Sequence, residues 1–464
     1  MNQPARWIQN SEREIPVVQP AKRIPFVKLF MRYPFFLLAL GPPIFRVPIV
    51  GSDTSQAHFD FWSIFQVGWI SLIALRALLR LAAAHSINIP KRVRSILKLA
   101  FYLGLLFLLS VTYSPGRIVS LEFSALYFMT LICVVEFVVD TYRDPPDWYQ
   151  CVLHFRLVSL LVYILVILTL PFAPNLVMQV IPGAGVRLLG GAVGSPTTLC
   201  PIIAIISAYS FRHSLEPRFR STVLFLVGLA GSLITQSRGT DIALLIVLAI
   251  LVIGWGRASK RSANTFIALS MTSLLLTGVV LGAIGGDRIW NTFNRGQDAA
   301  SIASGSGRTE IWSFAIQYCL THPQGMGYVA GFRSIFTKHF DLNFVGDVTR
   351  LGTSHNAFIQ YLVDGGWLGL ALYLFMLAKI FAVGMRFTKR GSLAVSTLES
   401  STVHAIRCGL LLLVYCLADG MDTSVFNIPL QEPFYYQNII VAIILGACAT
   451  MLVNSRPRYA SIAR

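Results

Sequence analysis

The chain has 464 residues, of which 55% are hydrophobic and only 13% are charged, and its mean hydropathy is +0.65. In soluble domains about a quarter of all residues are charged, so the composition excludes an ordinary soluble fold. The formal net charge of +17 would suit a nucleic-acid-binding protein. Its basic residues, however, form short clusters between apolar runs, which excludes that class and leaves membrane lipids as the expected surroundings.

Apolar runs recur along the whole chain, and each is long enough to cross about 30 Å of hydrocarbon as a helix. We therefore predict an all-α polytopic membrane protein with about twelve transmembrane helices. The expected spans are 34–50, 60–84, 96–113, 119–139, 156–172, 197–211, 221–236, 240–256, 264–284, 365–385, 404–419 and 434–453. The polar segment 1–33 lacks the early apolar stretch of a cleaved signal peptide and is expected to be a basic cytoplasmic tail.

Basic residues are distributed very unevenly between the two sides of this topology. The short loops of one side hold only Arg117, Arg187 and Arg238. The other side holds every basic cluster, namely residues 6–32, 91–98, 143–156, 212–220, 257–261, 386–390 and 456–464. By the positive-inside rule the basic side is cytoplasmic. We thus expect a multi-pass protein of the bacterial inner membrane, with both termini in the cytoplasm and the active site on the periplasmic side.

Residues 285–354 form one long exterior loop, which we expect to fold as a periplasmic cap because it is rich in aromatic and aliphatic residues. Within it, 308–320 is predicted to be a helix, with Ser306 as its N-cap and Pro323 beyond its end. Its apolar positions form one stripe, suited to the bilayer or the bundle, at 311, 312, 315, 316, 319 and 320. The expected organisation is a tail (1–33), transmembrane helices 1–9 (34–284), the cap (285–354), transmembrane helices 10–12 (355–453) and a second tail (454–464).

Three exterior arginines, Arg187, Arg238 and Arg308, are candidates for binding an anion. Guanidinium groups stay charged and bind anionic oxygens in a bidentate fork, so three that converge would form a phosphate or pyrophosphate clamp. Structural roles remain open for each of them. An arginine at the end of a span commonly reaches to lipid headgroups, and Arg308 could pair with Glu310 or Asp298.

His355 is the candidate general base. With Thr353 or Ser354 as N-cap, it would lie at the positive end of the helix that leads into the tenth span, where the helix dipole disfavours imidazolium. A neutral imidazole can accept a proton from a hydroxyl group. The alternative is that His355 and Asn356 only satisfy the end of that helix. Neither the cysteines, which are scattered and odd in number, nor any other cluster predicts a metal site.

Four charged residues fall within predicted spans or at their edges. Arg76 and Arg80 lie in the second span, and Glu122 and Glu136 lie in the fourth. Charges inside a membrane are candidates for function, but these could equally pair with one another and stabilise the bundle. Residue chemistry alone therefore predicts an exterior anion-binding pocket with one candidate base, and it names no reaction.

Four segments, in order, resemble the superfamily of O-antigen ligases and O-antigen polymerases, which are membrane glycosyltransferases. They are RLLGGAVGSPTT from 187, TQSRGTDIALL from 235, SGRTEIW from 306 with PQGMGY from 323, and TSHNAFIQYLVDGGWLGL from 353. The resemblance runs from about Arg187 to Leu370, and the expected number of spans extends it over the chain. Pro196-Thr197 departs from the Pro-Asn common in the first segment, which leaves the role of Arg187 open.

The resemblance implies a fold similar to the GT-C class and a reaction without metal, nucleotide or other cofactor. Family members take a glycan from an undecaprenyl pyrophosphate carrier at the periplasmic face. Ligases transfer it to the lipid A core and polymerases to another lipid-linked glycan, and these motifs do not distinguish the two. By the same resemblance Arg238 and Arg308 would hold the pyrophosphate, Arg187 and Asn356 would complete the binding set, and His355 would activate the acceptor hydroxyl.

Two other functions remain open from the sequence. A transporter or flippase of lipid-linked glycans would also need exterior arginines, but it has less need of a cap with a histidine at its base. The chain shows no convincing internal repeat, which counts against repeat-built transporters. A scaffold of a polysaccharide export complex would not depend on Arg238 or His355.

Overall fold

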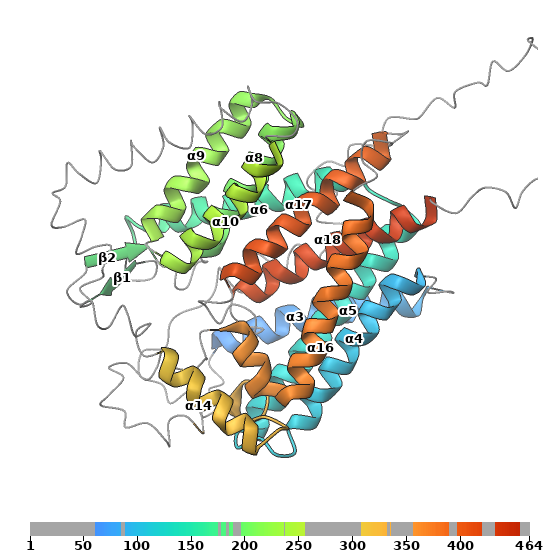
Figure 1. The fold of residues 1–464 in the computed structure, drawn as a ribbon, viewed down its shortest axis with the longest axis vertical. Coiled ribbons are helices and arrows are strands. Elements are labelled where there is room, and N and C mark those ends of the chain that lie inside the picture. The colour runs from blue at the N-terminus through green and yellow to red at the C-terminus, as the bar shows by residue number, and fades with distance from the viewer. Residues whose placement is uncertain are drawn as a thin grey trace, which may run out of the picture.

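The computed structural model describes residues 61–84, 89–174, 178–181, 185–188, 196–235, 237–255, 308–331, 335, 356–388, 397–419 and 432–454. The described chain is mainly helical (Figure 1). Its helices are α3 (Phe61–Ala82), α4 (Lys91–Ser110), α5 (Arg117–Arg143), α6 (Trp148–Thr169), α8 (Pro196–His213), α9 (Arg218–Thr235), α10 (Arg238–Trp255), α14 (Arg308–Thr321), α16 (Ala357–Thr388), α17 (Thr397–Asp419) and α18 (Glu432–Asn454). One antiparallel hairpin, β1 (Met178–Ile181) with β2 (Gly185–Leu188), departs from the expected all-α class.

Ten of the twelve predicted spans fall on the described residues, and each of the ten coincides with a helix. The spans at 34–50 and 264–284 lie outside the described residues, as do both tails and most of the predicted cap. Within the described part of the chain, six candidate membrane spans are long and apolar enough to cross a bilayer by length and composition, namely α4, α5, α6, α9, α16 and Ser400–Asp419 of α17. Shorter apolar stretches occupy Gly239–Ile253 and Gln437–Leu452. The protein is therefore a multi-pass membrane protein.

Helix α3 shows why the helices of this bundle are apolar on more than one face. Ile73 and Ala77 are buried against the rest of the protein, whereas Leu72 and Leu79 on the other side of the helix are exposed. In a soluble protein the exposed face would carry polar residues. Apolar residues on both faces are expected for a helix that contacts protein on one face and lipid on the other.

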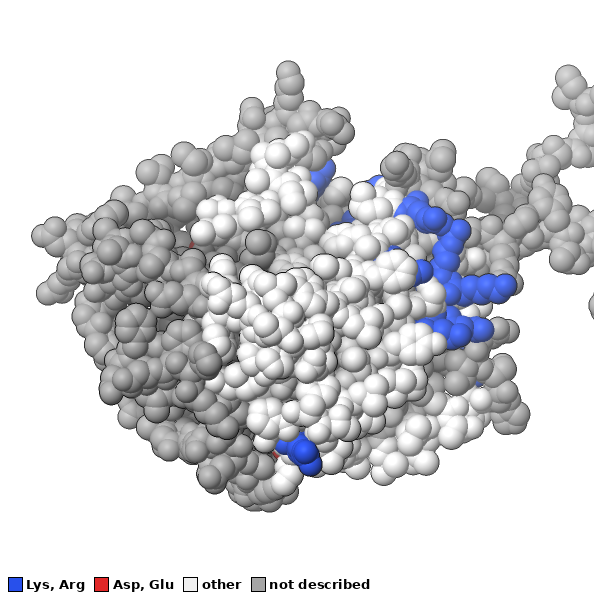
Figure 2. Space-filling model, turned by 60° about the horizontal axis from the view of Figure 1, so that its bottom comes forward, with Lys and Arg blue, Asp and Glu red and all other residues white. Residues whose placement is uncertain are grey.

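The two ends of the bundle differ in charge. Lysines and arginines gather at one end of the molecule, which we call the basic end (Figure 2). It includes the last turns of α3, α5, α8 and α16 and the first turns of α4 and α9. The opposite end, which we call the site end, is formed by the starts of α5, α8, α10 and α16 and the ends of α4, α9 and α17. Because successive helices run in opposite directions, the basic helix ends and the helix ends of the site end lie on opposite sides of the bundle.

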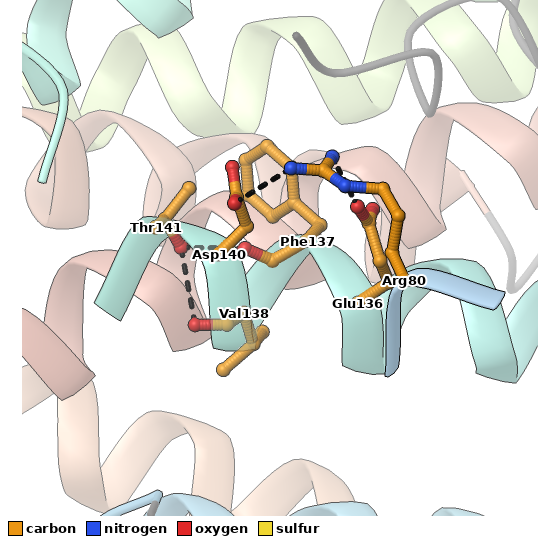
Figure 3. Close-up of polar contacts among 6 residues, drawn as sticks. All are labelled: Arg80, Glu136, Phe137, Val138, Asp140 and Thr141. Atoms are coloured by element: carbon orange, nitrogen blue, oxygen red, sulfur yellow. Dashed lines mark hydrogen bonds and ion pairs between the residues drawn. The ribbon is translucent and has the colours of Figure 1, made fainter. Parts of the chain in front are cut away.

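Two buried or half-buried arginines, Arg80 and Arg156, form ion pairs towards the basic end. Arg80 on α3 bonds to Glu136 at 2.6 Å and to Asp140 at 2.9 Å, one turn apart on α5 (Figure 3). Of the two alternatives left open by the sequence, the structure favours pairing for Arg80 and Glu136, and it adds Asp140 as a second partner. Arg156 on α6 pairs with Glu216 at 2.7 Å, and their side chains are only 2% and 5% exposed. Arg156 therefore joins α6 to the loop between α8 and α9 and does not lie on the surface with the other basic residues of that side.

Candidate functional site

The structure places the backbone of four of the five sequence-predicted site residues at the site end. Arg238 is the first residue of α10, Arg308 is the first residue of α14, and Asn356 directly precedes α16. Arg187 lies on β2, which packs beside α9, the helix that leads into the Arg238 turn. The side chains of the three arginines and all of His355 lie outside the described residues.

The turn that carries Arg238 is fixed to two neighbouring helices. The hydroxyl of Thr240 donates to Asp419 Oδ1 on α17 at 2.8 Å. One residue further, Asp241 Oδ1 accepts a hydrogen bond from the hydroxyl of Ser232 on α9 at 2.7 Å. The segment Ser-Arg-Gly-Thr-Asp therefore does more than supply an arginine, because its last two residues anchor the turn against α17 and α9.

This anchoring puts Arg238 where a helix itself attracts anions. The first turn of an α-helix has backbone N–H groups without intrahelical partners, and the helix dipole is positive there. An anion bound at the start of α10 would therefore meet these N–H groups as well as a guanidinium group. Beneath the turn, the side chain of Asp419 is buried, with an exposed fraction of 2%.

Helix α14 confirms the predicted helix in the cap, and its apolar stripe splits into two parts. Ile311, Ala315 and Cys319 are buried in one cluster with residues of α16. The Cys319 thiol contacts the carbonyl oxygen of Leu362 at 3.6 Å. Leu320, by contrast, is 66% exposed. The helix thus docks on the bundle through one edge and leaves apolar residues uncovered at the other.

The segment after α14, PQGMGY, folds into a turn that only glycine permits. Gly325 and Gly327 have φ values of +87° and +101°, in the left-handed region that other residues rarely adopt. A Cβ atom on Gly325 would also lie 2.6 Å from the backbone nitrogen of Gly366. Between the two glycines, the N–H group of Met326 donates to the carbonyl oxygen of Val363 at 2.6 Å. We call residues 323–331 the docking turn.

The docking turn lies against a kink in α16. Gly366 has φ +66° and ψ −166°, so α16 consists of a short arm, residues 357–365, and a long arm, residues 367–388. A Cβ atom on Gly366 would overlap the carbonyl oxygen of Pro323. That oxygen accepts a hydrogen bond from the N–H group of Trp367 at 3.2 Å. The kink therefore exposes a backbone donor that the docking turn uses.

Asn356 caps the short arm. Its side-chain oxygen accepts hydrogen bonds from the N–H groups of Phe358 at 3.0 Å and Ile359 at 3.2 Å. The expectation that Thr353 or Ser354 would cap this helix is therefore wrong. Asn is among the best N-cap residues, and here it also follows His355 directly. The capping bonds fix the backbone at the residue that follows His355 in the sequence.

Tyr113, in the loop after α4, supplies another link to the docking turn. Its hydroxyl donates to the carbonyl oxygen of Gln324 at 2.8 Å. Burial, followed by the negative charge of Asp364 and by Cys319, raises the pKa of Tyr113 to about 12. Tyr113 therefore remains a protonated donor at physiological pH. Among the described residues, no group of three His, Cys, Asp or Glu side chains is arranged to hold a metal ion.

Several polar residues of this end were not anticipated from the sequence. Thr240 and Asp419 fix the Arg238 turn, and Gln360 and Asp364 lie on the buried face of the short arm. One sequence signal for the last two was available. Asn356, Gln360 and Asp364 recur at intervals of four within an apolar run, which places three polar groups on one helix face.

The family comparison covers part of this end of the molecule, including the ends or starts of α9, α10, α14 and α16. The family model described as O-antigen ligase matches residues 223–374. That segment contains Arg238, Arg308, His355 and Asn356 and leaves Arg187 outside. No curated protein matches the chain. Residues 223–374 thus match the O-antigen ligase family model, which confirms the resemblance to the superfamily of O-antigen ligases and polymerases.

Proposed function

We propose that the chain is a glycosyltransferase of surface-polysaccharide assembly. It would move a glycan from an undecaprenyl pyrophosphate carrier to a sugar hydroxyl at the periplasmic face. The observation that carries the proposal is that Arg238 and Arg308 each begin a helix, at the same end of the molecule as the capped start of α16 after His355. The match to the O-antigen ligase family over these residues supports the same reaction class.

In the proposed reaction the acceptor hydroxyl oxygen attacks the anomeric carbon of the donor glycan. The imidazole of His355 takes the hydroxyl proton as general base. The bond between the anomeric carbon and the pyrophosphate oxygen breaks, and the carrier leaves with that electron pair. Direct attack from the opposite face inverts the anomeric configuration, so a product with retained configuration would contradict this step.

The arginines would stabilise the leaving group. Charge develops on the pyrophosphate oxygen as the glycosidic bond breaks, and fixed cations placed there lower the barrier without having to reorganise. Arg238 and Arg308 would supply two guanidinium groups, and the starts of α10 and α14 would add backbone N–H groups. Arg187 and Asn356 would complete the binding set. In this proposal the arginines do the work of a divalent cation, and no cofactor is needed.

Complementation in a host that lacks its own copy tests the proposal. His355→Ala, Arg238→Ala and Arg308→Ala would be compared with wild type at matched membrane levels. Arg117→Ala is the matched control, because Arg117 also begins a helix at the site end but lies outside the family match. Surface glycans and lipid-linked precursor would be read on gels. The proposal predicts that the three site variants lose the product and accumulate precursor, whereas Arg117→Ala behaves as wild type.

The precursor that accumulates distinguishes a ligase from a polymerase. Loss of ligation leaves long chains on the carrier, whereas loss of polymerisation leaves single repeat units. Wild-type behaviour of all three site variants would contradict the proposal and favour a transporter or scaffold. Equal loss in Arg117→Ala would also contradict the assignment of these particular arginines, because removal of an arginine outside the proposed site would then have the same effect.

A further inference from the structure

The short arm of α16 carries a column of polar side chains on its buried face. Asn356, Gln360 and Asp364 follow one another at intervals of one helical turn, and the last two are only 1% and 0% exposed. The side-chain amide of Gln360 donates to Asp364 Oδ1 at 3.0 Å, and its backbone N–H group donates to the carbonyl oxygen of Asn356 at 2.9 Å. The column therefore runs from Asn356, which follows His355 in the sequence, to Asp364, two residues before the kink at Gly366.

At its far end the column is bonded to the docking turn. Asp364 Oδ1 also accepts a hydrogen bond from the N–H group of Val329 at 3.1 Å. Val329 has a φ of +59°, which is unusual for a β-branched residue and persists only where the surroundings fix it. The carboxylate thus fixes a strained position of the docking turn, 35 residues away in the sequence.

The docking turn is held equally firmly on its other side. The backbone of Tyr328 accepts a hydrogen bond from the Ser120 hydroxyl at 2.6 Å and donates one to Ser110 Oγ at 2.9 Å. Its ring stacks on Phe107 with the centroids 3.9 Å apart. Residues of α4 and α5 therefore fix the turn to the membrane bundle, and Asp364 joins this fixed point to the short arm.

We infer that Asp364 is a positioning residue that docks the cap helix α14 against the short arm and thereby sets the start of α16 relative to the start of α14. The docking role of Asp364 is inferred from the contacts alone. Its role in the reaction rests on the proposed function, because Arg308 begins α14 and His355 precedes the start of α16 in the sequence. Carboxylate oxygens accept stronger hydrogen bonds than neutral acceptors, which suits a group that must hold a backbone donor and an amide together.

Alkylation of Cys319 tests the docking directly. Cys319 is buried in the contact between α14 and α16, so its thiol reports on whether α14 is docked. Purified full-length protein would be treated with a maleimide, and the labelled Cys319 peptide would be quantified by mass spectrometry. Asp364→Ala is expected to raise the labelling rate at least tenfold. Asp364→Asn retains an acceptor oxygen of the same shape and should stay within about threefold of wild type.

Asp140→Asn is the matched control, because it removes a carboxylate that pairs with Arg80 on α3, away from the docking turn. It should leave Cys319 labelling unchanged. Protection of Cys319 in Asp364→Ala would overturn the docking role whether or not the chain is a glycosyltransferase. If Asp364→Ala does not accumulate in the membrane, Asp364→Asn still tests the docking role. Fast labelling of Cys319 in Asp364→Asn would contradict a role that depends on hydrogen bonding.

Turnover tests the role of Asp364 in the reaction. In an assay of glycan transfer from a lipid-linked donor, Asp364→Ala should lower kcat about 100-fold and change the KM for the donor by less than about threefold, since misplaced reacting groups slow the chemical step. Asp364→Asn should restore most of kcat. Loss of turnover in Asp364→Asn with Cys319 still protected would overturn the positioning role, because the charge itself would then be required. Unchanged kcat in Asp364→Ala with Cys319 exposed would overturn the link between docking and reaction.

Discussion

The hydroxyl of Thr240 donates a hydrogen bond to Asp419 Oδ1 over 2.8 Å, joining residues 179 positions apart in the sequence. Thr240 stands two residues after Arg238, so this bond fixes the start of α10 against the end of α17. The conformation of the Arg238 turn is consequently determined by a helix that lies far away in the sequence and outside the family match.

Replacement of Thr240 with valine should destabilise the protein by roughly 1–3 kcal/mol, because a buried carboxylate loses one of its donors. The measurement is the unfolding midpoint of purified protein in detergent. Ser95→Ala is the control, since that hydroxyl lies on an exposed part of α4 and bonds only to the carbonyl oxygen of Arg92. Equal midpoints for Thr240→Val and Ser95→Ala would show that the bond to Asp419 does not contribute.

Gly366→Ala should be severely destabilising, by about 2 kcal/mol or more. Its φ of +66° disfavours any side chain, and a Cβ atom would overlap the carbonyl oxygen of Pro323. Gly365→Ala is the matched control, because a Cβ atom there meets the flexible end of the Leu106 side chain at 3.1 Å. Thermal unfolding of the two variants in detergent compares them. A similar loss in both would mean that the kink is not required.

Glu216→Ala should cost about 3–5 kcal/mol, because it leaves the buried guanidinium of Arg156 without its carboxylate. Replacing both partners with methionine should recover part of this loss. Since the pair lies away from the site end, activity per folded molecule should not change. Membrane abundance and specific activity, measured in parallel, separate the two effects. A variant with normal abundance and reduced specific activity would show that the pair has a functional role.

Cys319 should react slowly with maleimide across the neutral pH range. Burial, followed by the negative charge of Asp364, raises the pKa of its thiol to about 12. Below that pKa the group is mainly the unreactive thiol, and the thiolate fraction rises about tenfold per pH unit without becoming large at pH 9. Unfolding returns the pKa towards about 8.5 and should accelerate labelling strongly at pH 8. Fast labelling of the folded protein at pH 8 would contradict the buried position.

The positions of the helices could be predicted because an apolar run that crosses a bilayer must be a helix of about 20 residues. The same runs contain no information about which helices contact one another. Asp364 and Val329 are brought together by a kink at Gly366, and the Gly365-Gly366 pair does not by itself predict a kink, because glycine is common in transmembrane helices. The sequence therefore predicted one continuous helix start and placed its cap at Thr353 or Ser354, whereas Asn356 caps a separate short arm.

The candidate site could be predicted only as a set of residue types on one side of the membrane. Arg238 was singled out for its charge, while the residues that fix its turn, Thr240 and Asp419, look unremarkable at the ends of apolar runs. Arg80 with Glu136 could be anticipated, because charges inside a span need partners. Arg156 was assigned to the basic surface, since its partner Glu216 lies 60 residues away.

The most direct test of the central claim is glycan transfer by the purified protein in detergent, with a lipid-linked pyrophosphate donor, a saccharide acceptor and a chelator present. Wild type and His355→Ala would be compared by mass spectrometry of the product. The account predicts that wild type forms a new glycosidic bond and releases the pyrophosphate carrier, whereas His355→Ala forms at most about 1% as much. Equal transfer by His355→Ala, or no bond formation by wild type with a donor that it demonstrably binds, would contradict it.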